Sequence, residues 1–296
     1  MRRRFGVGLA FGLVLALCLN SSSSPQPPPG FLGTVTLHDS QPRFGGFSAI
    51  ELSSDGIQFL ALSDRGAFAE GTILRNAEGL LTEAEFGPVT RLLATADTLL
   101  AADRSDSEGL AVAEDGTAYV SFEGAARVLR YPKIGGPAEN LPNHPDFARM
   151  RINTALEALA IGPDHTLYAV PEQGGNGPIP VYRFRAGAWD ADPVTIRGSD
   201  GFRPVAADIG PDGRFYLLER RFHGVLGFSS RLRRFDVLPD RLAAEETLLH
   251  TPAGLHDNLE GLSIWLAKDG LRATMISDDN FFPLQVTEIV EYHLPD

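Results

Sequence analysis

The chain has 296 residues, a formal net charge of −12, 31 glycines, 21 prolines and a single cysteine. An acidic chain of this kind is a poor partner for nucleic acid, because binding to phosphates depends on clustered basic side chains. Abundant glycine and proline favour short strands joined by turns over long helices.

The N-terminus has the pattern of a secretory leader. Three arginines precede an apolar run over 6–19, which is too short to span a bilayer comfortably. We interpret 1–20 as a signal peptide, for the general secretory or the twin-arginine route, and the Ser/Pro-rich stretch 21–30 as a tether. Cys18 lies inside the leader, so the mature chain has no thiol for disulfides or metal ligation. The sequence therefore predicts an exported protein, periplasmic or extracellular, with no stable membrane span after leader removal.

From residue 31 onward the chain repeats one unit, and its best copy is 106–124 (DSEGLAVAEDGTAYVSFEG). Two short apolar runs flank an Asp-Gly turn, which is a strong hairpin signal because glycine adopts positive φ at little cost. An acidic residue stands at each end of the unit. The turn aspartates recur at a spacing typical of propeller blades; they are Asp55, Asp115, Asp164, Asp212 and Asp269.

The elements follow the chain as one strand over 31–38, five hairpin copies, and a last strand over 286–293. A single hairpin cannot bury both faces, whereas four-stranded sheets packed radially can. We therefore predict an all-β fold over 31–296, a β-propeller of five or six blades. A sixth blade would have to come from 72–103 or 236–256. Pairing of the N- and C-terminal strands would close the ring and remove exposed edges.

A first set of polar residues precedes the predicted inner strands. It consists of Glu108, Glu157 and Glu260, with Asn153 and Asn258 just upstream of two of them. In a propeller, equivalent positions of successive blades meet near the axis. Carboxylates that lie so near one another either require a cation or raise one another's pKa. Because all the donors are hard oxygens, we predict a divalent cation at the axis, with calcium favoured over zinc.

A second set of polar residues ends the following strands. Arg65 and Arg220 lie beside these residues, and a guanidinium fork binds a phosphate or carboxylate of a substrate or satisfies a buried acid. The acids could equally accept hydrogen bonds from backbone N–H groups of a neighbouring blade. The residues alone leave both roles open. The set comprises Asp64, Glu123, Glu172, Glu219 or Arg220, and Asp278.

Several of these pieces, in this order, resemble the phytase-like family described as having esterase-like activity. The pieces are 63–66 (SDRG), 106–111 (DSEGLA), Asn153 with 156–159 (LEAL), 218–220 (LER), 258–261 (NLEG) and 276–281 (ISDDNF). The resemblance spans about 45–281 and implies an exported propeller-like domain that hydrolyses phosphate or carboxylate esters. Ala158 departs from the family, which tends to have glycine after the glutamate, and the fourth copy has Val205 in place of the glutamate.

Our preferred hypothesis is a hydrolase for a small anionic ester. Arg65 and Arg220 would anchor the anion, and Asp64 or Asp278 would be the general base. A serine triad is not predicted, because the chain has no G-x-S-x-G elbow and no histidine at a motif spacing. The predicted ligands of the cation are Glu108, Asn153, Glu157, Asn258 and Glu260.

Two alternatives belong to other functional classes. One is a non-catalytic binding propeller in which calcium only stabilises the axis. The other is a metal-dependent sugar lactonase, since enzymes of that kind also line a propeller axis with Glu, Asn and Asp.

Overall fold

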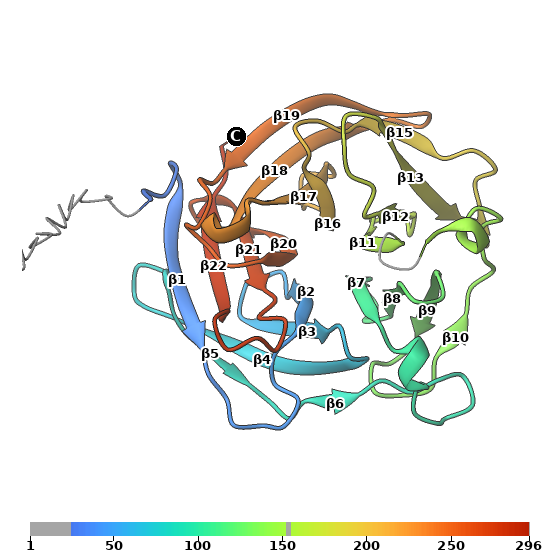
Figure 1. The fold of residues 1–296 in the computed structure, drawn as a ribbon, viewed down its shortest axis with the longest axis horizontal. Helices are drawn as coiled ribbons and strands as arrows, with labels where there is room; N and C mark the ends of the chain where they lie inside the picture. Colours follow the sequence, from blue (N-terminus) through green and yellow to red (C-terminus); the bar gives the residue numbers. More distant parts are fainter. Residues whose placement is uncertain (1–24, 152–154, 296) are drawn as a thin grey trace, which may run out of the picture.

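The described residues of the computed structural model, 25–151 and 155–295, form a β-propeller of five blades around a central axis (Figure 1). This decides between five and six blades, and the stretches 72–103 and 236–256 supply outer strands and loops of existing blades. Within the described residues there is no helix with the length and apolar character of a membrane span. The signal peptide, Cys18 and most of the tether lie outside the described residues.

Each blade is an antiparallel sheet whose first strand lies nearest the axis (Figure 1). Blade 1 contains β2 (Phe47–Leu52), β3 (Gln58–Ser63), β4 (Ala67–Arg75), β5 (Leu81–Phe86) and the short β6 (Thr90–Arg91). Blade 2 follows the 3-10 helix η1 (Ala102–Arg104) and contains β7 (Ser107–Val112), β8 (Ala118–Phe122), β9 (Arg127–Tyr131) and β10 (Glu139–Asn140).

Blade 3 follows the 3-10 helix η2 (Phe147–Arg149) and contains β11 (Leu156–Ile161), β12 (Leu167–Pro171), β13 (Pro178–Arg185), β14 (Ala188–Trp189) and β15 (Val194–Arg197). Blade 4 contains β16 (Arg203–Ile209), β17 (Phe215–Phe222), the 3-10 helix η3 (Gly224–Leu226), β18 (Phe228–Val237) and β19 (Leu242–His250). Blade 5 contains β20 (Leu259–Ala267), β21 (Gly270–Ser277) and β22 (Thr287–His293).

The N-terminal strand completes the last blade. β1 (Phe31–Leu37) pairs antiparallel with β22, so the outer strand of blade 5 comes from the other end of the chain (Figure 1). This confirms the predicted closure by terminal strands. Because every blade then has two neighbours, the ring has no open end at which another chain could add a blade.

The core consists of five apolar clusters, one between each pair of neighbouring blades. Phe47 of blade 1 and Ile289 of blade 5, for example, share one cluster, while Leu156 of blade 3 and Val128 of blade 2 share another. This distribution follows from the alternation of side chains along each strand, which gives each sheet two faces to bury.

The predicted turns join the first two strands of their blades. The N–H of Gly116 donates to the carbonyl oxygen of Ala113 at 2.8 Å, and Oδ1 of Asp115 accepts the N–H of Thr117 at 2.9 Å. Gly116 has a φ of 82°, and in the third blade His165 takes the corresponding left-handed conformation with a φ of 61°. The turn aspartate in blade 2 is therefore used within its own hairpin, as predicted for Asp115 and Gly116.

Candidate functional site

A β-bulge lies at the same place in all five inner strands. In β20, for example, Leu259 pairs with Ser277 and Gly261 with Ile276, so Glu260 is the extra residue. A bulge bends the strand and redirects a side chain. The bulge positions in successive blades are Ser48, Glu108 with Gly109, Glu157, Val205 and Glu260. The three glutamates therefore lie within the inner strands, which corrects the prediction that they precede them.

In blades 1, 2, 3 and 5 the residue of the second set directly follows the second strand. The N–H of Glu123 donates to the carbonyl oxygen of Asp106 at 2.9 Å, and the N–H of Glu172 donates to that of Ala155 at 2.9 Å. Asp64 and Asp278 make the same hydrogen bond, to Gly46 at 2.8 Å and to Asn258 at 2.9 Å. These backbone bonds keep each second-set residue beside the bulge of its own blade.

In blade 4 the equivalent position is occupied by Arg220, which pairs with Arg203. Glu219 points the other way, is fully buried, and accepts hydrogen bonds from Arg231 at 2.8 Å and Arg233 at 2.6 Å. Successive side chains of a strand point to opposite faces, so only one of the two predicted residues, Glu219 or Arg220, can face the axis. Glu219 stabilises blade 4, and Arg220 is the residue that reaches the axis.

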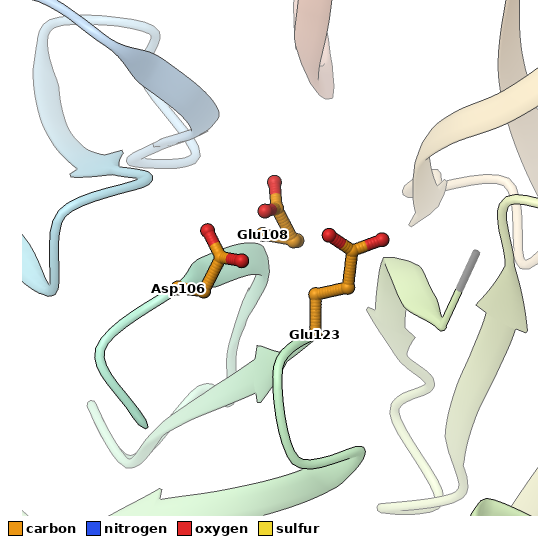
Figure 2. A group of neighbouring side chains, drawn as sticks. All are labelled: Asp106, Glu108 and Glu123. Carbon is orange, nitrogen blue, oxygen red and sulfur yellow. The ribbon is translucent and has the colours of Figure 1, made fainter. Parts of the chain in front are cut away.

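Three carboxylates of blade 2 converge beside the axis. Asp106, Glu108 and Glu123 each offer an oxygen, and these oxygens lie within 4.8 Å of one another. Figure 2 shows their carboxylates pointing toward a common space. An all-oxygen set of this kind suits Ca²⁺ or Mg²⁺. Glu108 was predicted as a ligand, whereas Asp106 was missed; its only signal was its place two residues before Glu108.

Blade 3 adds further carboxylates to this region. Burial raises the pKa of Glu157, and the neighbouring Glu172 and Glu260 raise it further, while Arg220 opposes them. Burial and then Glu157 likewise raise the pKa of Glu108. These shifts show that the carboxyls are close enough to disfavour one another's charge. A cation placed among them would reverse that effect.

Arg220 is a cation that the chain itself brings to the axial carboxylates. Its Nη1 contacts Oε1 of Glu260 and Oδ1 of Asn258, and its Nη2 lies 3.5 Å from Oε1 of Glu172. Asn258 also donates through Nδ2 to Glu260 at 2.8 Å. Of the predicted cation ligands, Asn258 and Glu260 are therefore engaged with Arg220. Asn153 lies outside the described residues.

The two candidate bases lie at the ends of neighbouring blades. Burial raises the pKa of Asp64 to about 6, with Arg65 opposing the shift and Glu260 adding to it. Burial and then Glu260 raise the pKa of Asp278 to about 8. Asp278 also accepts the N–H of Asn280 at 2.7 Å. Burial and neighbouring acids thus raise the pKa of Asp278 further than that of Asp64, and such a difference between two carboxyls is the pattern of an acid and base pair.

Arg65, the other predicted anchor, lies at the rim. It is exposed, and its guanidinium carbon stacks 3.4 Å from the centroid of the Phe281 ring. This cation–π contact fixes the side chain beside Asp64 without using its hydrogen-bond donors. The structure thus places Arg65 near one candidate base and Arg220 among the axial carboxylates.

None of the curated proteins matches the sequence. Two solved structures with a similar fold are a PQQ-bound aldose sugar dehydrogenase from Streptomyces coelicolor and a gluconolactonase from Xanthomonas campestris. The first is 14% identical with a TM-score of 0.45, covering 91% of this chain and 100% of that one. The second is 14% identical with a TM-score of 0.46, covering 92% of this chain and 97% of that one.

A family model described as phytase-like, esterase-like activity of phytase, matches residues 42–281. The matched stretch includes all five inner strands and both sets of axial side chains. The chain therefore belongs to the phytase-like family.

Proposed function

We propose that this protein is an exported hydrolase of phosphate or carboxylate esters that uses a divalent cation, calcium in preference to zinc, at the axial carboxylates. The observation that carries the proposal is the convergence of Asp106, Glu108 and Glu123 within 4.8 Å. The family's description as esterase-like supports the reaction class, and the leader-like residues 1–20 support export.

The donor set fits a hard cation. It consists of carboxylate oxygens alone, and Glu157 next to Glu123 adds a further carboxyl group. Calcium takes six to eight oxygen ligands and completes its shell with water, so three carboxylates form a partial shell that substrate could complete. A bound cation would polarise the ester oxygen and lower the pKa of a coordinated water.

Two carboxyls would then move protons. Asp64, with a pKa of about 6, is ionised at neutral pH and would accept a proton from the attacking water as its oxygen bonds to phosphorus or to the carbonyl carbon. The bond from that atom to the leaving oxygen breaks, and Asp278, with a pKa of about 8, would give its proton to that oxygen. Arg220 would hold the anionic part of the substrate.

Chelation tests the cation. We expect exhaustive chelation to lower the melting temperature and to reduce ester hydrolysis at least tenfold, with both restored by calcium, because the axial carboxylates then repel one another without compensation. Glu108→Gln combined with Glu123→Gln should reproduce the loss and abolish the calcium response.

Glu83→Gln, on the exposed outer strand β5, is the matched control and should behave like the wild type. Calcium-dependent stability without turnover of phosphate or carboxylate esters would favour a binding propeller, and turnover of lactones alone would favour a lactonase. Hydrolysis that persists after chelation and in a Glu108→Gln, Glu260→Gln variant would contradict the proposal.

The pH profile tests the proton-transfer groups. The base must be ionised and the acid protonated, so kcat/KM should be maximal near pH 7 and fall roughly tenfold per pH unit below about 6 and above about 8. The measurement needs an ester that does not itself titrate between these values. Asp64→Asn should remove the acidic limb together with most of the activity. A profile that is flat from pH 5 to 9 would exclude this pair.

A further inference from the structure

A pocket of about 490 Å³ opens beside the axial carboxylates at blade 4, with Glu172 of blade 3 and Asn258 of blade 5 also in its wall. Its volume is in the range of small-molecule sites. Arg220 lines this pocket and also contacts Glu260, so the pocket adjoins the candidate catalytic site. Its wall includes Arg203, Arg220, Arg221, Phe222, Phe228 and Asn280.

One side of the pocket is cationic. Arg203 and Arg220 lie directly opposite each other on β16 and β17, and Glu172 is the carboxylate they share, at 3.0 Å and 3.5 Å. Like charges in cross-strand positions destabilise a sheet. The exposed guanidinium of Arg221 has no hydrogen bond or ion pair with any other residue that the structure describes. Arg203, Arg220 and Arg221 all line the pocket, and because Arg220 is also paired with Glu260, it is Arg203 and Arg221 that offer positive charge to an anion bound there.

The other side of the pocket is apolar and open to solvent. Phe222 is 64% exposed and packs on Phe228 with the ring centroids 5.0 Å apart. Val225 and Leu226, on the same loop, are also exposed. An exposed aromatic pair that lines a pocket, with further exposed aliphatic side chains on the same loop, marks a binding surface.

The loop that carries these side chains is held in place. Nε2 of His223 lies 2.8 Å from Oγ of Ser229, and the N–H of Gly254 donates to the carbonyl oxygen of Phe228 at 2.9 Å. The N–H of His223 also donates to the carbonyl oxygen of Gly227 at 2.8 Å. An apolar wall fixed in this way loses little conformational entropy when a ligand binds.

We propose that this pocket binds small amphiphilic anions, with a phosphate or carboxylate head on Arg203 and Arg221 and an alkyl or aryl body on Phe222 and Phe228. The inference rests on the proposed function only in treating such anions as the substrate class of the hydrolase. Arg220, between the pocket and the axis, would orient the head toward the axial carboxylates. The preferred substrates would then be esters with an apolar group, and highly charged polyols would bind more weakly.

Binding of a molecule that cannot be hydrolysed tests this without reference to catalysis. Octylphosphonate, kept below its micelle concentration, should bind the full-length protein at least tenfold more tightly than methylphosphonate or inorganic phosphate in calorimetric titrations. The protein should be chelated beforehand, so that the axial cation plays no part. Octyl glucoside, which has the same tail without charge, should bind at least tenfold more weakly than octylphosphonate.

Variants separate the two halves of the pocket. Arg221→Gln together with Arg203→Gln should weaken octylphosphonate at least tenfold, and Phe222→Ser should abolish the difference between octyl and methyl probes. Arg241→Gln, in an exposed ion pair outside the pocket, is the control and should change neither. Melting temperatures of the variants check folding, and Arg221→Gln alone provides a test without loss of an ion pair.

Equal binding of octylphosphonate and methylphosphonate would overturn the proposal, as would an affinity unchanged in the arginine variants. Association with anionic vesicles without binding of monomeric octylphosphonate would also overturn it and would assign the exposed loop to a membrane surface. These titrations measure binding alone. Octylphosphonate can therefore bind as proposed even if the protein hydrolyses no ester, and the protein can hydrolyse esters even if octylphosphonate does not bind.

Discussion

Replacing Arg220 with glutamine is expected to lower the free energy of unfolding by about 3 kcal/mol at neutral pH, the cost of breaking a buried ion pair by removing one partner. The Arg220 side chain is 22% exposed, and the Glu260 and Glu172 side chains that it contacts are each 10% exposed. Its removal leaves Glu260 without its cation, while Glu172 keeps Arg203 at 3.0 Å. Denaturant unfolding of the variant and the wild type at pH 7.5 measures the difference.

The loss of stability in Arg220→Gln should also depend on pH. Burial raises the pKa of Glu260, and Arg220 opposes that shift. Without Arg220 the pKa of Glu260 in the folded state rises further above its value in the unfolded chain. Protonation then favours the folded variant, so its deficit should be largest above pH 8 and should shrink as the pH falls toward 5.

Two further variants test the assignment of the Arg220 effect. Arg241→Gln removes an ion pair whose side chains are 62% and 72% exposed, and it should change stability by less than about 0.5 kcal/mol. Adding Glu260→Gln to Arg220→Gln should recover part of the loss, because it removes the unpaired charge. If Arg220→Gln cost no more than Arg241→Gln, Arg220 would not be the counter-charge of the axial acids.

Asp208→Asn is expected to stabilise the protein above pH 7 by about 2–4 kcal/mol, since one pKa unit corresponds to about 1.4 kcal/mol. Asp208 lies near the end of β16, and burial raises its pKa from 3.8 to about 7. Glu51, near the end of β2, has a pKa raised by burial and then by Asp208. The two therefore meet at the opposite end of the inner strands from Glu108.

The sign of the Asp208 effect follows from proton linkage. Between pH 4 and 7 the folded protein retains a proton that the unfolded chain releases, so this group makes stability fall as the pH rises and then level off above 7. The asparagine variant has no such fall in stability with rising pH, because its side chain does not ionise. It can still accept the N–H of Ile264, which donates to Asp208 at 2.5 Å. Its advantage should therefore be small at pH 4 and full at pH 8.

Urea unfolding of both proteins at pH 4, 6 and 8 provides the measurement. Asp115→Asn is the matched control, because a backbone hydrogen bond from Thr117 lowers the pKa of that exposed turn aspartate. Asp115→Asn should therefore destabilise the protein at the higher pH values, where Asp208→Asn stabilises it. A gain for Asp208→Asn that is the same at pH 4 and pH 8 would show that ionisation of Asp208 is not its cause.

Much of the fold could be predicted because its signals are local. The Asp-Gly pairs specify turns through the positive φ of glycine, as at Gly116 with a φ of 82°. The strand over 31–38 could be matched with the last strand because a ring with an open edge is unfavourable. The number of blades could not be settled, because outer strands such as β5 and β19 carry many exposed polar residues and have only a weak hydrophobic period.

The candidate site was predicted in part. Glu108 could be identified because it occupies an equivalent position in a repeated unit, and equivalent positions meet at the axis. Asp106 was missed because its role depends on the bulge in β7, which brings Asp106 and Glu108 to the same space as Glu123 (Figure 2). A bulge changes the direction of a side chain without leaving a clear mark in the amino-acid pattern.

The sequence by itself determined the hairpins, the closed ring and the recurrence of acids at two positions of each repeat, because these depend on residues close together in the chain or on its two ends. Only the tertiary structure decided which acids share a space, which of them Arg220 neutralises, and that Glu219 serves blade 4 instead. Those outcomes depend on strand register and on contacts between blades, such as that of Arg220 with Glu260. Such contacts form only when the ring closes, so they could not be deduced from neighbouring residues in the chain.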